Sequence, residues 1–510
     1  MIASRRQFLS AAVVGLTPKT ERSITGGFID DGHDPGHRLR DHAAFPAAKQ
    51  TIKIPLLIVG GGIAGLSAAW WLDKHGFRDF VLLEMLEQAG GNARWGENEI
   101  TPYPWAAHYV PVPGRKAALV RELFEELGVL RDGVWEERHL CFSPQERLYL
   151  HGRWQEGIEP VTAATARDRE DFASFFDRVR EFRATGEFTI PMELGARPSP
   201  LDRVSMAQWL EHEHFTSPYL HWYINYACRD DYGALAADTS AWAGIHYFAS
   251  REPEEKGPLT WPEGNGWIVR RLLTKLGRYV QTGAMVHRII TQGRKLRVSA
   301  GAADYIADTV IFAAPSFLTS YVCESARPVH GIVYSPWLTA NLTLDRLPRE
   351  HDIETAWDNV IYDSPALGYV VATHQSLRTH IDRTVWTFYW ALAQGSPADN
   401  RRLLLEKNWS YWKEAILSDL ERAHPDIRQC VSRIDVLRLG HAMARPVPGF
   451  LGSQERRGLT ESSGNLLFAN SDLSGFSIFE EAQYRAVKAA ERALRRLQGT
   501  AVQHRDRLVR

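Results

Sequence analysis

Short apolar runs separated by a glycine-rich turn mark the region that follows the first fifty residues. Ile54–Val59 (IPLLIV) is apolar throughout, which is typical of a strand buried on both faces of a parallel sheet. Gly60–Gly65 follows directly, and the next residues, LSAAWWLDKHG, predict a helix that ends at Gly76. A second apolar run, Phe80–Leu83, predicts another strand, and Glu84 comes directly after it.

The order strand, G-x-G-x-x-G turn, helix, strand and acid predicts a dinucleotide-binding βαβ unit. The first glycine of such a unit allows a tight turn, the second lets the backbone approach a pyrophosphate, and the third lets the helix pack closely on the strand. The helix N-terminus offers unpaired N–H groups to the phosphates, and the acid accepts hydrogen bonds from the ribose hydroxyls. The predicted cofactor contacts are Gly60, Gly62, Ile63, Ala64, Gly65 and Glu84.

A second glycine pair, Gly90 and Gly91, lies in the segment MLEQAGGNARWG and is followed by Arg94. A simple NAD-binding domain has no use for this pair, and an ordinary glycine loop with a surface arginine is the alternative interpretation. The segment resembles the stretch that lies along the FAD pyrophosphate and ribityl chain in the flavin-containing amine oxidase superfamily, the monoamine oxidase and phytoene desaturase type. Asn92 stands where many members of that superfamily have arginine.

The resemblance returns at two distant places. The segment AMVHRI and the following RKLRVSAGAADYIADTVIFAAP resemble the superfamily's second FAD segment, which makes Val286 the expected adenine contact. Near the C-terminus, NLLFANSD resembles a strand end that contacts the flavin chain, with Asp472 in place of the usual glutamate. The helix that follows resembles the last FAD-contacting helix, and its N-terminus around Phe479 would direct its dipole at the flavin. The implied cofactor is FAD.

The resemblance implies an α/β fold in which a Rossmann-like FAD-binding domain of the GR2 type is interleaved with an α+β substrate domain. The chain of 510 residues is long enough for two hydrophobic cores. The expected segments are 52–125, 255–325 and 430–500 for FAD binding, 126–254 and 326–429 for the substrate domain, and 1–50 for a signal and linker.

The candidate substrate-site residues lie in aromatic and polar runs outside the glycine motifs. His108, in PYPWAAHY, is the residue we first expect to touch flavin or substrate, and a buried structural histidine is the alternative. The run CRDDYG places Arg229, Asp230 and Asp231 together, as an internal ion pair, which we favour, or as a lining for a cationic substrate. Many amine oxidases carry a lysine that holds a water at flavin N5, and the corresponding stretch here, Gly331–Leu344, has none.

These observations predict an FAD-dependent oxidoreductase that oxidises a primary or secondary amine, including polyamines, by hydride transfer to flavin N5. Positioning would supply most of the catalysis and the flavin the electronic chemistry. The absent lysine leaves the electron acceptor open between O2 and another species, and it motivates an alternative, the dehydrogenation or desaturation of an apolar substrate. A flavin-binding protein without turnover, its flavin face covered by residues 126–254, is a third possibility.

Composition and charge exclude several other classes. Sixty Lys and Arg against sixty-one Asp and Glu give a net charge of -1, which argues against nucleic-acid binding. The four cysteines form no C-x-x-C pair, and Pro35 and Gly36 between His33 and His37 argue against helical metal ligands, so we expect no metal.

The N-terminus matches an export pattern. Ser4–Leu9 (SRRQFL) resembles a twin-arginine motif, and the apolar stretch Phe8–Leu16 is too short to span a membrane. We therefore expect a periplasmic protein without a transmembrane segment, exported by the twin-arginine route.

Overall fold

The computed structural model describes residues 23–29, 32–193, 199–252, 257–324, 331–349, 351–378, 380–460 and 464–508, without the side chains of 459–460 and 499–508. The expected twin-arginine motif at residues 4–9 lies outside the described residues. Within the described part of the chain, no helix is long and apolar enough to cross a membrane.

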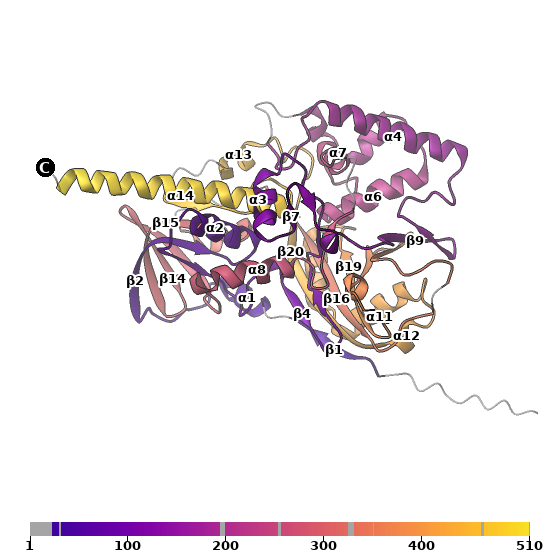
Figure 1. Cartoon of the computed structure of the whole chain (residues 1–510), viewed down its shortest axis with the longest axis horizontal. Helices are drawn as coiled ribbons and strands as arrows, with labels where there is room; N and C mark the ends of the chain where they lie inside the picture. Colours follow the sequence, from indigo (N-terminus) through magenta and orange to yellow (C-terminus); the bar gives the residue numbers. More distant parts are fainter. Residues whose placement is uncertain are drawn as a thin grey trace, which may run out of the picture.

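The glycine-rich turn belongs to a seven-stranded sheet, at the left of Figure 1. Its order is β12–β3–β2–β15–β14–β13, with β21 beside β15. The bounds are β2 (Gln50–Val59), β3 (Phe80–Leu83), β12 (Val280–Gln281), β13 (Val286–Gln292), β14 (Lys295–Ala300), β15 (Ala303–Phe312) and β21 (Leu466–Phe468). Strands β3, β2, β15 and β21 are parallel, so the chain must cross over between them, and β13, β14 and β15 form an antiparallel meander.

Three helices from distant parts of the sequence pack on this sheet. They are α2 (Ile63–Lys74), α8 (Gly266–Leu276) and the long C-terminal α14 (Phe479–Leu508), which runs beside α2 and extends beyond the sheet in Figure 1. Their apolar faces share one core with α3 (Ala118–Glu126). The three segments expected to bind FAD therefore build one α/β layer.

An eight-stranded sheet forms the second half of the molecule, in the order β1–β20–β16–β19–β18–β17–β9–β10. The bounds are β1 (Thr25–Phe28), β9 (Glu146–Leu150), β10 (Arg153–Glu156), β16 (Val333–Leu344), β17 (Asp358–Ile361), β18 (Gly368–Val371), β19 (Thr384–Ala391) and β20 (Val431–Arg445). Two sets of helices accompany it: α4 (Ala166–Ala184), α5 (Met206–His212), α6 (Pro218–Tyr232) and α7 (Ala241–Ala249), and then α10 (Pro397–Glu406), α11 (Trp409–Leu420) and α12 (Ile427–Cys430).

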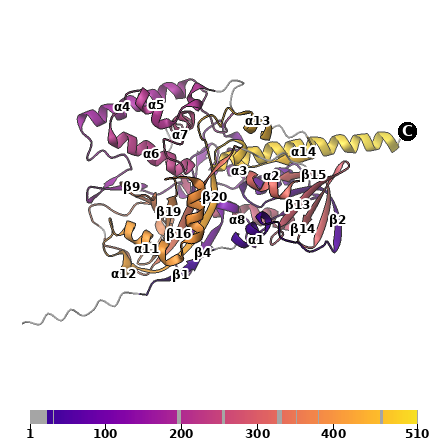
Figure 2. The same cartoon turned by 180° about the vertical axis from the view of Figure 1, so that it is seen from behind.

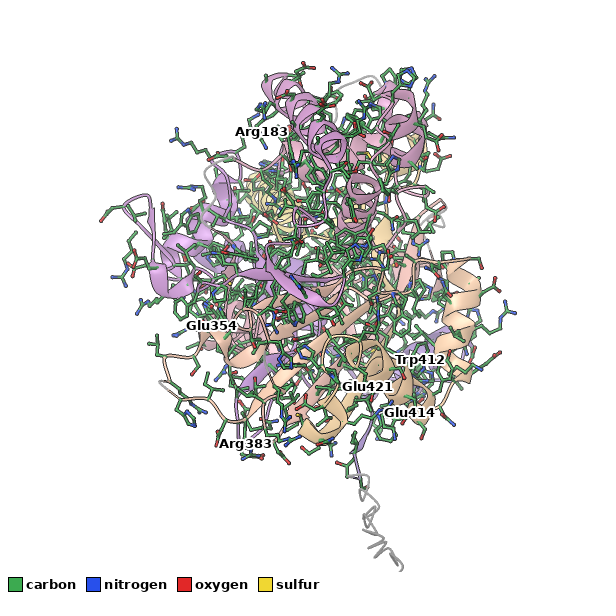
Figure 3. The ribbon with its side chains drawn as sticks, turned by 90° about the vertical axis from the view of Figure 1, so that its right-hand side faces the viewer. Arg183, Glu354, Arg383, Trp412, Glu414 and Glu421 are labelled. Carbon is green, nitrogen blue, oxygen red and sulfur yellow. The ribbon has the colours of Figure 1, made fainter. Side chains whose placement is uncertain are left out.

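The two sets of helices lie at opposite ends of this half. Figure 3 shows Arg183 of α4 at the top of the molecule, whereas Trp412 and Glu414 of α11 lie at the lower side. Trp412 is buried in the core between α11 and the sheet, and the guanidinium of Arg428 bonds both Glu414 and Glu421 at the surface. The helices α4–α7 form a separate core rich in aromatic residues.

Short elements complete the chain. They are α1 (His33–Arg40), β4 (Trp95–Glu97), β5 (Pro102–Pro104), β6 (Tyr109–Val110), β7 (Leu130–Arg131), β8 (Val134–Trp135), β11 (Leu259–Thr260), α9 (Thr319–Val322), α13 (Gln454–Thr460) and the 3-10 turns η4 (Gly277–Tyr279) and η7 (Ser471–Leu473). Figure 2 shows α1 from behind; Leu39 of this helix packs on the face of the first sheet that lies opposite α8.

Three expectations about the course of the chain differ from the structure. Strand β20 lies in the range 430–500 that we expected in the FAD-binding domain, but it pairs with β16 in the second sheet. Residues 25–28, expected in a linker, form the edge strand β1 of that sheet. Pro35 lies in the first turn of α1, where a helix tolerates proline, so His33 and His37 do share a helical face, with ring centroids 3.8 Å apart. No group of three or more metal-ligating side chains occurs among the described residues.

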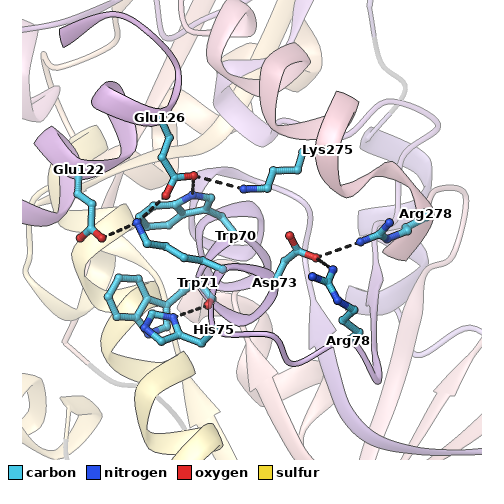
Figure 4. Close-up of polar contacts among 10 residues, drawn as sticks. Trp70, Trp71, Asp73, His75, Arg78, Glu122, Glu126, Lys275 and Arg278 are labelled. Carbon is cyan, nitrogen blue, oxygen red and sulfur yellow. Dashed lines mark hydrogen bonds and ion pairs between the residues drawn. The ribbon is translucent and has the colours of Figure 1, made fainter. Parts of the chain in front are cut away.

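Two clusters of polar contacts, one of them around the buried Asp73, hold the first two FAD segments together (Figure 4). The Asp73 carboxylate at the end of α2 accepts from Arg78 at 2.5 Å, from Arg278 at 3.1 Å and from the Tyr279 hydroxyl at 2.9 Å. Glu126 of α3 accepts from the Trp70 indole and pairs with lysines of α2 and α8. The carboxylates therefore tie α2 to η4 and to α3.

Candidate functional site

The glycines of the first turn are required for two different reasons. Gly60 has a φ of 101°, and an added Cβ would lie 3.0 Å from the Ala314 nitrogen. A Cβ on Gly65 would lie 1.8 Å from the Gly60 carbonyl oxygen, so close helix–strand packing excludes any side chain. A Cβ on Gly62, in contrast, would meet nothing nearer than the Gly91 Cα at 3.9 Å. The protein itself therefore leaves open space at Gly62, at the N-terminus of α2.

The open space at Gly62 lies beside the backbone N–H groups at the N-terminus of α2. Gly62 is the N-cap of α2 and supplies no side chain to cap the helix. The first N–H groups of a helix have no intrahelical partner, so those of Ile63, Ala64 and Gly65 point out of the helix end. Such an end, with its positive dipole, is a ready-made site for an anion.

Glu84 closes the turn from the side. Its carboxylate accepts from the backbone N–H of Gly61 at 2.6 Å and of Leu86 at 2.9 Å, and burial raises its pKa. The backbone oxygen of Glu84 accepts from Ala284 N–H at 2.8 Å. This bond brings Val286, the first residue of β13, to the neighbourhood of the predicted ribose-binding acid.

The second glycine pair lies against the first turn. Gly90 N–H donates to the Gly61 oxygen at 2.8 Å, and Gly90 and Gly91 have φ values of 133° and 56°, which favour glycine. The buried Arg94 folds back, and its Nε donates to the Gly91 oxygen at 3.3 Å.

The third segment reaches the same place. Asn470 donates to the Ala314 oxygen at 2.8 Å, next to Gly60. The buried carboxylate of Asp472 accepts from Ser316 N–H at 2.8 Å and from the Tyr334 hydroxyl at 2.6 Å, and burial raises its pKa. Short contacts thus bring the three segments to one region, where Val286 and Asp472 are placed through neighbouring residues and not by direct contact with the other predicted cofactor residues. Phe479 stacks on Phe124 at the start of α14.

A cavity of about 150 Å³, which we call the junction cavity, lies where these segments meet the second sheet. Its lining includes Asn92 and residues 106–109 from the first segment, Asn265 from the second and residues 477–480 from the third. Three buried polar atoms of its lining residues have no hydrogen-bond partner in the described part of the chain: Asn265 Oδ1, Trp337 Nε1 and Glu480 Oε2. Unpaired buried polar atoms are costly, so a polar ligand would stabilise this arrangement.

A larger cavity of about 340 Å³ adjoins the junction cavity, with which it shares His108, Tyr109, Asp230, Asp231 and Arg251. We call it the acidic cavity, because four carboxylates line it. They are Glu146, Asp230, Asp231 and Asp358. Burial is the largest cause that raises the pKa of each; that of Asp230 rises to about 6 and that of Asp231 to about 7.

His108 lies at the boundary of the two cavities, as a residue in contact with flavin or substrate would. Its ring packs against Tyr389, Tyr109 and Trp357, with centroids 4.4, 4.9 and 5.5 Å away. Burial lowers its pKa to about 4, so the ring is neutral at pH 7. Its Nδ1 lies 3.3 Å from the Ala106 oxygen; a proton on Nδ1 would leave Nε2 as an acceptor.

The favoured ion pair of Arg229 with a neighbouring aspartate is absent among the described residues. Arg229 points away from the cavities and donates to the backbone oxygens of Ser364 and Pro365, both at 3.1 Å. Helix α6 is fixed by Ser217, whose hydroxyl accepts from Leu220 N–H, and by Gly233, which ends it at a φ of 59°. The end of α6 therefore supplies Asp230 and Asp231 to both cavities, and a cationic substrate beside them stays a prediction.

Two lining residues, Glu146 and Asp358, escaped the sequence analysis, because no local motif surrounds either of them. The stretch in which many amine oxidases carry a lysine, Gly331–Leu344, contains strand β16. From β16, Trp337 and Thr339 line the junction cavity, and the Thr339 hydroxyl donates to the Trp105 oxygen at 2.7 Å.

Comparisons with known proteins agree with this architecture. A family model described as an NAD(P)-binding Rossmann-like domain matches residues 58–127. The bovine peroxisomal N(1)-acetyl-spermine/spermidine oxidase is 29% identical over 161 residues, and the match spans 31% of this chain and 31% of that enzyme.

Solved structures extend the similarity to almost the whole fold. Putrescine oxidase bound to putrescine superposes with a TM-score of 0.66 at 16% identity, covering 87% of this chain and 99% of that one. Cyclohexylamine oxidase from Brevibacterium oxydans gives a TM-score of 0.66 at 15% identity, again covering 87% and 99%. The chain therefore has the α/β fold of these two oxidases, with a Rossmann-like nucleotide-binding domain.

Proposed function

We propose that this protein is an FAD-dependent oxidoreductase that oxidises a primary or secondary amine. The observation that carries the proposal is the contact between two cavities of different character. The junction cavity is lined by all three segments expected to bind FAD, and the acidic cavity beside it is lined by four carboxylates that attract a protonated amine. The similarity in fold to putrescine oxidase and cyclohexylamine oxidase supports the same assignment.

The residues present fit FAD. The open space at Gly62 and the free N–H groups of Ile63, Ala64 and Gly65 would receive the pyrophosphate. Glu84 would bind the adenosine ribose, Val286 the adenine, and the second glycine pair with Arg94 the pyrophosphate and ribityl chain. Asp472 and the start of α14 at Phe479 would lie beside the remaining flavin chain and ring.

FAD, when bound, supplies the acceptor for a hydride from the carbon next to the amine nitrogen, and the protein's residues position that substrate. The carboxylates of Asp230 and Asp231 would draw the ammonium form towards the junction cavity. The neutral ring of His108 offers an acceptor for an N–H of the amine, and the aromatic residues around it exclude water. The amine must lose its proton before the hydride leaves, and the carboxylate of Asp231, whose pKa burial raises to about 7, is the lining group that would accept it.

The alternative reaction, desaturation of an apolar substrate, fits the acidic cavity poorly. An apolar molecule in it would offer no hydrogen-bond partner to four buried carboxyl groups, whether they are protonated or charged, and buried polar groups without partners are costly. A flavin-binding protein without turnover would need its flavin face covered by residues 126–254. Those residues contribute Asp230 and Asp231 to the cavity walls instead, and the space between the walls suits a substrate.

The electron acceptor is O2 or another oxidant. Thr339 and Trp337 line the junction cavity from β16, the strand in which many amine oxidases carry a lysine that holds a water at the flavin and this sequence has none. Reduced protein mixed with oxygen or with an artificial acceptor separates the two, since only an oxidase is reoxidised rapidly by oxygen.

The test is anaerobic reduction of the purified holoprotein. Amines that bleach the flavin absorption support the proposal. Bleaching by apolar alkenes or ketones alone would favour the desaturase, and flavin reduced by dithionite but by no substrate would favour a protein without turnover. A preparation that contains no flavin, from a host with ample riboflavin, would contradict the cofactor assignment.

Export by the twin-arginine route to the periplasm is part of the same proposal and is supported by Ser4–Leu9. Cell fractionation of the wild type and of a variant with Arg5→Lys and Arg6→Lys tests it. The wild type should be periplasmic and the variant retained in the cytoplasm; equal distributions would contradict export by this route.

A further inference from the structure

The acidic cavity contains two pairs of carboxylates that the fold places side by side. Glu146 of β9 and Asp358 of β17 are register partners on neighbouring parallel strands, so both side chains leave the same face of the sheet, with strands about 4.8 Å apart. Asp230 and Asp231 are consecutive residues in the last turn of α6, where the helix dipole already carries negative charge. Both arrangements are unfavourable for anions in the absence of a cation.

The charges of Arg229 and Arg251 act on Asp230 and Asp231 from nearby, but no described basic side chain bonds these pairs directly. Among the described residues, none of the four carboxylates makes an ion pair with a lysine or arginine. The contact of Asp230 with the Tyr109 hydroxyl, at 3.4 Å, is long. The cation that lines the cavity, Arg251, bonds Glu480 at 2.6 Å, and this carboxylate is itself fully buried.

A second observation points to a ligand in the adjoining junction cavity. Glu480 Oε2 is buried and without a hydrogen-bond partner, and Glu480 lines the junction cavity together with Asp230 and Asp231. The acidic cavity itself, at about 340 Å³, lies within the usual range of small-molecule sites, about 300–1,000 Å³. Tyr226 and Trp357 add aromatic surface to its walls, which suits the methylene chain and the charged ends of an aliphatic cation.

The two pairs lie at different depths relative to the junction cavity. Asp230 and Asp231 line both cavities, whereas Glu146 and Asp358 line the acidic cavity alone. A molecule whose reacting nitrogen lies in the junction cavity would therefore extend past the first pair towards the second. Burial raises the pKa of all four carboxyl groups, so a pair that keeps one proton carries one negative charge. One ammonium group neutralises such a pair, and two pairs take two.

We infer that the substrate is an aliphatic di- or polyamine whose second, non-reacting ammonium group is bound by Glu146 and Asp358. This inference rests on the proposed function, because it takes the nitrogen in the junction cavity to be the one that is oxidised. Glu146 and Asp358 are then specificity residues: they decide which amine binds and take no part in the transfer of electrons.

The experiment compares 1,4-diaminobutane with 1-aminobutane, which lacks only the second amino group. We expect anaerobic reduction of the holoprotein at a KM for the diamine roughly ten- to hundredfold below that for the monoamine, as the loss of one charge-assisted bond would give. Glu146→Gln and Asp358→Asn should raise the KM for the diamine by a similar factor, leave kcat within about twofold, and leave the monoamine unaffected. Glu156→Gln, at an exposed position of the edge strand β10, is the matched control and should change neither KM.

A thermal-shift measurement provides a readout that does not depend on turnover. The diamine should raise the apparent Tm of the wild type more than the monoamine does, and this difference should disappear in Glu146→Gln. The variant without ligand should be at least as stable as the wild type, because it relieves repulsion between neighbouring carboxylates. A variant that fails to fold would contradict this expectation, and Asp358→Asn gives the second test.

The outcomes separate the inference from the proposed function. If both amines reduce the flavin with equal KM, and neither variant changes the ratio, the distal ammonium site is wrong and amine oxidation stands. If no amine reduces the flavin, the proposed function is wrong and the inference fails as a statement about substrate. A diamine-specific thermal shift would then show only that the cavity binds dications.

Discussion

Substitution of two glycines in the same turn should separate the cost to the fold from the cost to cofactor binding. Gly62→Ala adds a methyl group that meets nothing within 3.9 Å, at a φ of −73° that any residue adopts. Replacing an N-cap glycine by alanine lowers the stability of the folded state by about 1 kcal/mol, and the lower entropy of the unfolded chain offsets about 0.4–1 kcal/mol of this loss. We therefore expect the flavin-free variant to be about as stable as the wild type.

Gly65→Ala should behave in the opposite way. Its methyl group would lie 1.8 Å from the Gly60 oxygen and 3.0 Å from the Gly60 carbonyl carbon, so helix α2 must move away from β2. Overpacking of this kind costs about 1–3 kcal/mol, and an overlap with the backbone belongs at the upper end. Gly277→Ala is the matched control, because that exposed glycine at the end of α8 has no atom near the added methyl.

The assay is the apparent Tm of flavin-free protein at a fixed scan rate, together with the flavin content of the purified variants. In Gly62→Ala the methyl group occupies space that the pyrophosphate needs, so a cost of about 1–3 kcal/mol should appear in binding, a roughly ten- to hundredfold weaker affinity. Full flavin content in Gly62→Ala would refute the placement of the phosphates. A wild-type Tm in Gly65→Ala would refute the packing argument.

Three further predictions concern charge and the site. Burial raises the pKa of Asp230 to about 6 and that of Asp231 to about 7, so between about pH 4 and 7 the folded protein binds more protons than the unfolded chain. Its stability should therefore fall as pH rises through this range. Asp231→Asn should flatten the dependence of Tm on pH, and an unchanged dependence would contradict the assignment. Asp73→Ala should destabilise the flavin-free protein by about 2 kcal/mol, because it removes the charge-assisted hydrogen bonds that the buried carboxylate accepts. Glu122→Gln, at a half-exposed pair, should cost less than about 1 kcal/mol, and equal losses of stability in the two variants would contradict the role given to burial. His108→Phe should lower kcat/KM for an amine about tenfold through the loss of one hydrogen bond. The shape of the pH profile of kcat/KM should not change, because a pKa of about 4 keeps the His108 ring neutral. Loss of an inflection near neutral pH in the variant would refute the neutral ring.

The first nucleotide-binding unit could be predicted from the sequence almost residue by residue. The run Ile54–Val59, the three glycines and Glu84 carry their structural requirements locally. A tight turn needs the φ of Gly60, and close packing of the adjoining helix needs Gly65. Strand β3 and helix α2 accordingly have the bounds that the pattern indicated, within a few residues.

The acidic cavity, by contrast, was decided by tertiary structure. Glu146 and Asp358 are far apart in the chain and become neighbours only through the register of β9 and β17, and no local pattern contains that register. The sequence also did not determine the partners of Arg229. Its guanidinium bonds the backbone oxygens of Ser364 and Pro365, which only the tertiary fold brings close to it. Local backbone preferences thus determined where a nucleotide can bind, and long-range strand pairing determined what charge faces it.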